Sequence, residues 1–478
     1  MKRFNLVLLL QFVVVLSFGQ YTLKGVVIGN SDPLAGASVI IKNTFYGIST
    51  SSNGTFEFKN LRQEEIVLQV SFIGFEPVEK RINLKGSHTI TINLEPNVVL
   101  TDEVLVSATR AKDKTPMAYN NLSGSEIDQK NMGQDIPYLL QLTPSFVATS
   151  DAGTGIGYTN FRVRGTDLNR INVSVNGIPL NDAESHGTWF VDLPDLASSL
   201  ENVQIQRGVG TSTNGAAAFG ATINLQTNSL KKDAYGEYKT AFGSFNTFKN
   251  TVAVGTGLIN GKFTIDARLS KVTSRGFINM ASSDLKSFFV SGGYYTENTV
   301  LKMNVFSGFE ETYQAWYGVP SVRLNDDYEG MQEYADNWLM SQEEVNHMIN
   351  SDSRKYNYYT YPNQVDHYQQ DHYQLHFSHR FNPNVNFNAS AHYTYGRGYY
   401  ENFKAEEDLE DYNLSAITVG EETIESTDLV NRKWLDNHFY GLTYSLNYYE
   451  NNSDLIIGGG YSIYDGDHYG NVIWAEFY

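Results

Sequence analysis

Three histidines lie close together in the chain, and histidine is the residue type most often used to bind transition metals. His372, His376 and His379 have the spacing that would converge on one side of a helix. They stand, however, in a segment of alternating apolar and polar residues, which predicts a strand on which His372 and His376 share one face and His379 takes the other. A metal needs its ligands on one face. We therefore predict ordinary strand positions and no metal site.

A second group contains the residue types of a hydrolase: Ser185-His186, with Asp182 and Glu184 beside it. The sharp glycine-flanked turn that presents a nucleophilic serine is missing around Ser185. The chain also has no cysteine, which excludes thiolate nucleophiles, thiolate metal sites and disulfides. We predict an exposed loop, no catalytic residues, no enzyme activity and no cofactor.

Composition narrows the class of protein further. The 478 residues hold 35 Lys and Arg against 53 Asp and Glu, a net charge of −18, so binding to nucleic acid is disfavoured. The 32 Tyr, 27 Phe and 40 Gly indicate a protein rich in β-structure with aromatic bands.

The first residues have the pattern of a secretory signal. Lys2 and Arg3 precede a mostly apolar run at 4–18, followed by small residues, which predicts a signal peptide over residues 1–20. The alternative, a membrane anchor, is disfavoured because the run is shorter than the roughly 20 apolar residues that span a bilayer.

Residues 21–96 contain short period-two segments separated by turn residues, which predicts a small antiparallel β-sandwich. Three stretches resemble the carboxypeptidase regulatory-like domain, a family that is non-catalytic: Gly36-Ala37-Ser38-Val39, Thr50-Ser51-Ser52-Asn53-Gly54-Thr55-Phe56 and Phe72-Ile73-Gly74-Phe75. Ser51 stands where that family usually has an acidic residue. A secreted carboxypeptidase-like enzyme is disfavoured because it would need zinc ligands, and His88 is the one histidine of this region.

A polar linker at 97–116 follows. Within it, acidic residues precede alternating valines, which suits a segment that adds as a strand to the sheet edge of a partner. The residues concerned resemble the TonB box: Asp102, Glu103, Val104, Leu105, Val106, Ser107 and Ala108. The glycan-importing branch of that family usually has a Gly-Tyr-Gly-type run next, where this chain has Ala108-Thr109-Arg110.

Residues 117–228 mix short helical signals with strands, including a hairpin at 170–180 that turns on Asn176-Gly177. Four ordered blocks resemble the plug domain of TonB-dependent outer-membrane receptors: Phe161-Arg162-Val163-Arg164-Gly165, Val173-Ser174-Val175-Asn176-Gly177-Ile178-Pro179-Leu180, Glu201-Asn202-Val203-Gln204-Ile205-Gln206-Arg207-Gly208 and Gly215-Ala216-Ala217-Ala218-Phe219-Gly220-Ala221-Thr222-Ile223-Asn224-Leu225. Ala221 stands where the family commonly has a second glycine.

Residues 229–478 alternate apolar and polar side chains over long segments, as at 385–395 and 440–448. A soluble sheet with one buried face has the same period, so the connections must decide. Tight turns alternate with connections that include two long ones, at 310–365 and 398–433, as in an outer-membrane barrel. Strands are expected near 235–243, 248–258, 261–272, 285–295, 299–309, 366–380, 385–397, 434–449, 454–464 and from about 470.

The expected fold class is mainly β: an N-terminal β-sandwich, an α+β plug domain and the first ten or so strands of an antiparallel transmembrane β-barrel. Transporters that hold a plug have about 22 strands. Ten strands cannot enclose a plug of this size, so we expect the sequence to be truncated within the tenth strand.

The plug resemblance implies that loops 151–158 and 181–189 face outward and touch a ligand, with polar and aromatic groups converging on a concave site. The long connection after residue 309 adds aromatic candidates. The residues expected to bind ligand are Asp182, Glu184, His186, Trp189, Tyr313, Trp316 and Tyr317. Solvated loops and an interfacial aromatic girdle are the alternatives.

The plug also contains cations that would be buried in the barrel. We expect Arg162, Arg164 and Arg207 to pair with carboxylates of the inner barrel wall, since an unpaired buried charge is costly, and so to fix the plug until force is applied. The residues expected to shape or gate the plug are Arg162, Arg164, Gly165, Asn176, Gly177, Arg207, Gly208 and Gly220.

The resemblance implies energy-coupled import across the outer membrane, driven by TonB of the TonB-ExbB-ExbD complex, with sandwich and TonB box in the periplasm. A ferric siderophore leads as the ligand; haem, cobalamin and glycans are alternatives. A surface receptor or adhesin that uses the barrel as a mount is a further alternative. No nucleic-acid partner is expected.

Overall fold

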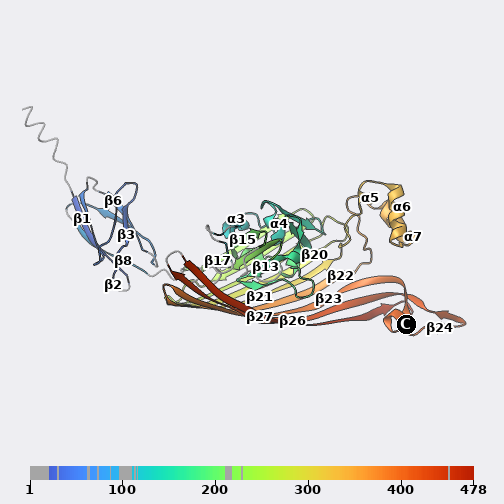
Figure 1. Cartoon of the computed structure of the whole chain (residues 1–478). Helices are drawn as coiled ribbons and strands as arrows, with labels where there is room; N and C mark the ends of the chain where they lie inside the picture. The colour runs from blue at the N-terminus through green and yellow to red at the C-terminus, as the bar shows by residue number, and fades with distance from the viewer. Residues whose placement is uncertain are drawn as a thin grey trace, which may run out of the picture. The chain divides into compact units, whose positions relative to one another are not determined.

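The computed structural model describes residues 21–29, 32–61, 65–72, 75–84, 86, 88–95, 110–111, 115, 117–209, 218–227, 230–450 and 453–477. Strands dominate, and the chain forms two compact units, one up to Leu100 and one from Thr101 onward (Figure 1). Among the described residues no helix is both long enough and apolar enough to cross a membrane.

The N-terminal unit is a β-sandwich of two four-stranded sheets around one apolar core. One sheet runs β2–β1–β5 with β8 beside β1, and the other runs β4–β3–β6–β7. β1 and β8 pair in parallel, which corrects the expectation of a wholly antiparallel sandwich. The strands are β1 (Tyr21–Gly29), β2 (Asp32–Pro33), β3 (Ser38–Ile41), β4 (Gly47–Ser49), β5 (Thr55–Leu61), β6 (Glu65–Ser71), β7 (Val78–Asn83) and β8 (His88–Leu94).

The second unit begins with a compact α+β plug. Its five-stranded sheet runs β14–β13–β16–β15–β9, and a three-stranded sheet runs β10–β11–β12. The strands are β9 (Ala118–Ser123), β10 (Phe146–Ser150), β11 (Thr159–Val163), β12 (Thr166–Asp167), β13 (Ile171–Val175), β14 (Ile178–Pro179), β15 (Leu200–Arg207) and β16 (Ala221–Thr227). The predicted hairpin between β13 and β14 is confirmed: Asn176 and Gly177 take φ of 53° and 79°.

Short helices complete the plug. α3 (Gly124–Asp128) begins with a capping box between Ser123 and Glu126, and α4 (Ile136–Leu140) begins with a proline in its first turn. Two 3₁₀ turns, η4 (Phe190–Asp192) and η5 (Leu196–Ser199), lead into β15.

A nine-stranded antiparallel sheet follows, in chain order from β17 to β27. Its curve faces the plug elements, which lie against one side of it (Figure 1). The strands are β17 (Tyr235–Gly243), β18 (Thr247–Gly255), β19 (Phe263–Ser274), β20 (Ser283–Tyr295), β21 (Thr299–Tyr313), β22 (Val365–Asn382), β23 (Val385–Asp408), β26 (Ser426–Glu450) and β27 (Ser453–Ala475).

The two faces of this sheet differ in polarity. Along β26, the exposed Leu442, Tyr444 and Leu446 alternate with Thr443 and Ser445, which are less exposed. The same holds along β23, where polar residues are buried on the plug side: Asn386, Asn388, Ser390 and His392. Along β23 and β26 the apolar face therefore points away from the plug, and the polar face points toward it.

Two strand predictions need correction. The expected tenth strand near residue 470 is the outer part of β27, which continues to pair with β26 through Asp465 and Gly466. The expected loop 398–433 shrinks to 409–425, because β23 and β26 stay paired as far as Asp408 and Ser426. This shorter loop holds η7 (Leu409–Tyr412) and the small hairpin of β24 (Ile417–Val419) and β25 (Glu422–Ile424).

The connection 314–364 is long, as predicted, but it is folded. It contains α5 (Ser321–Leu324), α6 (Tyr328–Asn337) and α7 (Gln342–Asn350), which enclose a small core of their own. α7 begins with a capping box between Ser341 and Glu344. Tyr313, expected in this loop, is the last residue of β21.

Candidate functional site

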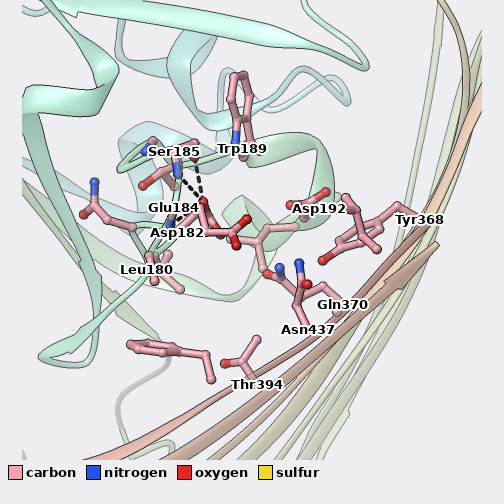
Figure 2. A pocket seen from close by; sticks show the side chains of 18 of the residues that line it. Leu180, Asp182, Glu184, Ser185, Trp189, Asp192, Tyr368, Gln370, Thr394 and Asn437 are labelled. Atoms are coloured by element: carbon pink, nitrogen blue, oxygen red, sulfur yellow. Dashed lines mark hydrogen bonds between the residues drawn. The ribbon is translucent and has the colours of Figure 1, made fainter. Parts of the chain in front are cut away.

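A cavity of about 550 Å³ lies between the plug and the polar face of the sheet. The plug loop that follows β14 forms one wall, and residues of β21, β22, β23, β26 and β27 form the other. Figure 2 shows Asp182 and Glu184 of this loop facing the same space as Thr394, Gln370 and Asn437 of the strands. The cavity has the size of a small-molecule binding site.

The loop 181–189 is held in a defined turn. Asn181 donates from Nδ2 to the carbonyl of Ile171 at 2.9 Å and accepts from the amide of Val173 at 2.8 Å. The Asp182 carboxylate accepts from the amide of Ser185 at 2.6 Å and from its hydroxyl at 2.8 Å (Figure 2). The hydroxyl of Ser185 therefore stabilises this turn by donating to Asp182.

The expected ligand-binding residues divide into two sets. Asp182, Glu184, Trp189 and Trp316 line the cavity, and the other three expected residues lie outside its lining: His186, Tyr313 and Tyr317. The hydroxyl of Tyr313 donates to the carbonyl of Tyr361 at 2.6 Å, and the ring of Tyr317 stacks on Tyr359 at 5.4 Å between ring centroids. These two tyrosines thus stabilise the folded loop.

Aromatic side chains from the plug and from the connection 314–364 meet at the cavity wall. Tyr158 packs edge-on against Trp189 and Trp316, with centroid distances of 6.1 Å and 5.7 Å. Trp316 also contacts Tyr400 of β23 at 5.6 Å. Because offset and edge contacts fix ring orientation, these rings form a rigid wall.

Carboxyl groups lie beside this wall. The Tyr158 hydroxyl donates to Asp366 of β22, and Glu310 of β21 and Asp192 of η4 also line the cavity. Burial, then repulsion from Asp366, Asp182 and Asp135, raises the pKa of Asp192 well above its ordinary value. Sequence reasoning missed Glu310 and Asp366; the only signal was an acidic residue on the polar face of each strand.

The plug is anchored to the sheet by one buried carboxylate. The Asp195 side chain has no exposed surface and accepts from Lys249 Nζ of β18 at 2.7 Å and from Arg268 Nη1 of β19 at 3.4 Å. Burial alone would raise the pKa of Asp195, but these two cations outweigh it and hold the pKa below the ordinary value. Further donors are Ser198 at 2.6 Å, Asn131 at 3.0 Å, Thr251 at 2.7 Å and Ser270 at 2.6 Å.

This arrangement reverses the expected polarity, because the plug supplies the anion and the sheet supplies the cations. The expected pairing of Arg162 with the barrel wall is wrong. Arg162 is exposed and pairs at 2.8 Å with Asp167 of the same plug hairpin. Arg207 donates to the carbonyl of Pro144 at 3.3 Å, inside the plug, and Arg164 is exposed.

The expected glycine positions of the plug have distinct geometry. Gly165 and Gly208 take positive φ, as Gly177 does. At Gly220 a Cβ would lie 2.5 Å from Thr166, so this position is crowded. At Gly308 of β21 a Cβ would lie 1.9 Å from the carbonyl oxygen of Asp192, so the missing side chain lets the sheet approach the plug.

Two predicted segments lie outside the described residues. They are the signal peptide at 1–20 and the TonB-box-like residues Asp102, Glu103, Val104, Leu105, Val106, Ser107 and Ala108.

The three histidines occupy strand positions, as expected. His372 and His376 are buried on the polar face, where they pair with the hydroxyls of Thr394 and Ser390 at 3.1 Å and 2.9 Å. His379 contacts the hydroxyl of Thr299 at 2.8 Å. Within the part of the chain that the structure describes, no group of three or more His, Asp or Glu side chains could hold a metal ion.

Comparison with known families assigns two regions. Residues 23–106 match the carboxypeptidase regulatory-like domain, and residues 111–222 match the TonB-dependent receptor plug domain. The TonB-dependent receptor SusC of Bacteroides thetaiotaomicron is 28% identical over 173 residues, which are 34% of this chain and 16% of that protein.

Solved structures share the fold at low sequence identity. The ferric-catecholate import receptor Fiu of E. coli K12 in its open form has a TM-score of 0.54 and 14% identity, over 74% of this chain and 50% of that chain. FpvA of P. aeruginosa, bound to a heterologous ferric pyoverdine, has a TM-score of 0.54 and 13% identity, over 80% of this chain and 48% of that chain. The chain thus spans about half the length of these receptors.

Proposed function

Because the chain carries the plug domain of TonB-dependent receptors, we propose that it imports an extracellular ligand across the outer membrane by energy-coupled movement of that plug. The observation that carries the proposal is the plug on the polar face of an antiparallel sheet whose other face is apolar, with a lined cavity between them. An apolar outer face and a polar inner face are what a transmembrane barrel requires.

In the proposed cycle, the ligand binds in the cavity against the loop 181–189 and the aromatic wall. The segment 102–108 then pairs with TonB of the TonB-ExbB-ExbD complex in the periplasm and transmits a pull. The contacts of Asp195 with Lys249 and Arg268 resist that pull until they separate. The work comes from the inner membrane, so this chain needs no hydrolytic site.

A ferric siderophore is the leading ligand, since solved receptors with this fold include one for ferric catecholates and one for ferripyoverdine. Haem, cobalamin and glycans are the alternatives. Growth of a knockout strain on defined iron, haem and cobalamin sources, with and without the gene, separates them.

Deleting residues 102–108 tests the mechanism. We expect uptake to be abolished while ligand binding at the cell surface stays within about twofold, because in this proposal the segment engages TonB and takes no part in binding the ligand. A control deletes residues 97–100 of the linker and keeps the acidic-valine segment and the last sandwich strand, β8, intact. Unchanged uptake in the 102–108 deletion would contradict transport and would favour a receptor or adhesin that uses the sheet as a mount.

A further inference from the structure

The cavity between plug and sheet is lined by charge of one sign. Among the described residues that line it there is no lysine or arginine. The lining contains six carboxyl groups, which are Asp151, Asp182, Glu184, Asp192, Glu310 and Asp366. A ligand with net negative charge would meet carboxyl groups on both walls and no lysine or arginine of the described lining to pair with, which is unfavourable in a site with restricted water.

Glu310 is the most informative of the six. Its side chain is 1% exposed, its Oε1 has no hydrogen-bond partner among the described residues, and its Oε2 has a long contact of 3.4 Å with the Thr312 hydroxyl. A buried acceptor without a partner destabilises the protein, and more so when it is charged. A donor supplied by a ligand removes that cost.

Two other buried polar atoms of the lining have no hydrogen-bond partner among the described residues. They are Nε2 of His372, a residue that is 3% exposed, and Oγ1 of Thr188, a residue that is 2% exposed. They belong to opposite walls, β22 and the plug loop. Residues of both walls therefore contain buried hydrogen-bonding atoms that no described residue satisfies, which a ligand could satisfy.

Aromatic rings stand next to these carboxyl groups. The rings of Tyr158 and Trp316 form part of the lining, and the Tyr158 hydroxyl donates a hydrogen bond to Asp366. Carboxylates combined with ring faces bind organic cations, through charge pairing and attraction to the ring quadrupole. A metal cation is a poor fit, because the described residues contain no metal-ligating cluster.

Resting on the proposed role of this cavity as the ligand site, we infer that the ligand presents an ammonium or guanidinium group to Glu310, in the cavity that the rings of Tyr158 and Trp316 also line. The inference narrows the ligand class. A siderophore with a free amine fits the lining, whereas a net negative ferric tris-catecholate does not.

The electrostatics of the plug wall agree with this assignment. Burial raises the pKa of Asp151 to about 7, and burial with repulsion from neighbouring carboxylates raises that of Asp192. Carboxyls with raised pKa values hold protons while the cavity is empty, and a bound cation favours their ionised forms. Cation binding therefore releases protons and strengthens as pH rises toward 8.

Three probes of similar size and different charge test the inference on the protein purified from its native outer membrane. They are phenethylamine, which is cationic at pH 7.5, 2-phenylethanol, which is neutral, and phenylacetate, which is anionic. Titration calorimetry gives the affinities, and quenching of the tryptophans at the cavity reports the site. We expect phenethylamine to bind most tightly and phenylacetate least.

Glu310→Gln keeps the size of the side chain and removes its charge. We expect it to weaken phenethylamine binding by at least about tenfold, since charged hydrogen bonds are the strong ones, and to leave 2-phenylethanol within about twofold. Glu311→Gln is the matched control: Glu311 is adjacent, exposed and paired with His367 at 3.3 Å, outside the cavity lining. It should change neither affinity.

Equal binding of the three probes, preference for phenylacetate, or no binding would overturn the inference, and so would a cation affinity that Glu310→Gln leaves unchanged. Heat-modifiable migration on gels shows that each variant is folded. These binding measurements do not involve TonB. The inference can therefore fail while the 102–108 deletion still supports transport. Equally, the probes can bind as expected while the deletion contradicts transport.

Discussion

Asp195 shows how much can depend on a single side chain. It takes a left-handed conformation with φ of 51° between two short turns, and it gathers two cations and four other donors from the plug and the sheet. An ion pair of this kind adds little stability over an apolar contact, but removing one partner leaves buried charge uncompensated. Its role is therefore best tested by substituting the anion.

We predict that Asp195→Asn loosens the plug. Without the carboxylate, Lys249 and Arg268 face each other unpaired, which costs about 3–5 kcal/mol. Hydrogen exchange should report faster exchange of the amides of β15 and of the residues around Asp195. Asp128→Asn is the control, because its pair with Lys239 is 45% and 40% exposed and should be worth less than about 1 kcal/mol. Equal effects of the two variants would exclude a special role for Asp195.

A pH prediction follows from Asp151. Its folded pKa of about 7 lies above the ordinary 3.8, so the folded state holds a proton that the unfolded state releases between these values. The stability of the wild type therefore falls as pH rises from about 4 to 7. Asp151→Asn removes this loss: it should match the wild type near pH 4 and exceed it at pH 8. The gain cannot exceed about 4 kcal/mol, since about three pH units contribute about 1.4 kcal/mol each.

Thermal melts at four pH values check this. A constant difference across the range would contradict the link to ionisation, whatever its sign.

The residues of the cavity were only partly predictable from sequence. The resemblance to the plug domain located loop 181–189, so Asp182, Glu184 and Trp189 were predicted as ligand-binding residues. Glu310 and Asp366 could not be assigned, since strand pairing and plug position decide which acids meet. The partners of Asp195 lie 54 and 73 residues away in the chain. Arg162 pairs with Asp167, five residues further on in its own hairpin, and this local partner was not considered when a partner on the barrel wall was predicted.

At the scale of elements, the β13–β14 hairpin depends on one backbone conformation. Gly177 has φ of 79°, and a Cβ there would meet no atom within 4 Å. Gly177→Ala should therefore cost about 1 kcal/mol from conformation alone. Gly236→Ala is the control, since that Cβ is also free and the residue lies in strand β17 at ordinary φ. It should be neutral or slightly stabilising, and equilibrium unfolding separates the two cases.

Element types were more predictable than element lengths. Alternation located each of the nine strands, but β23 and β26 continue beyond the alternating segments because each added pair extends an existing ladder. The helices of 314–364 were missed, although Ser341 and Glu344 form a capping box at S-x-x-E spacing that the sequence displays. The buried residues of these helices, Met331 and Ala335 in α6 and Val345 and Met348 in α7, are few, although they stand at helical spacing.

At the scale of the whole second unit, the plug and the sheet are complementary in polarity. The sheet turns buried Asn, Ser, Thr and His side chains toward the plug, and at β20 and β21 Phe289 and Phe306 join the apolar core of the plug. Separating plug and sheet would therefore break hydrogen bonds and would also expose the apolar contacts of Phe289 and Phe306. The apolar face on the other side is left for lipid under the proposed function.

That assignment of faces leads to a direct prediction for neighbouring residues of β26. Leu442→Arg places a charge on the apolar face, where an arginine near the middle of a bilayer costs about 2–4 kcal/mol. Thr443→Arg places the same side chain on the polar face, where water and acceptors are available, and should cost less than half as much. Urea titration of the protein folded into phosphatidylcholine vesicles measures both. If a soluble partner instead of lipid covered the apolar face, Leu442→Arg would fold equally well with and without vesicles. If the faces were reversed, Thr443→Arg would be the more damaging change.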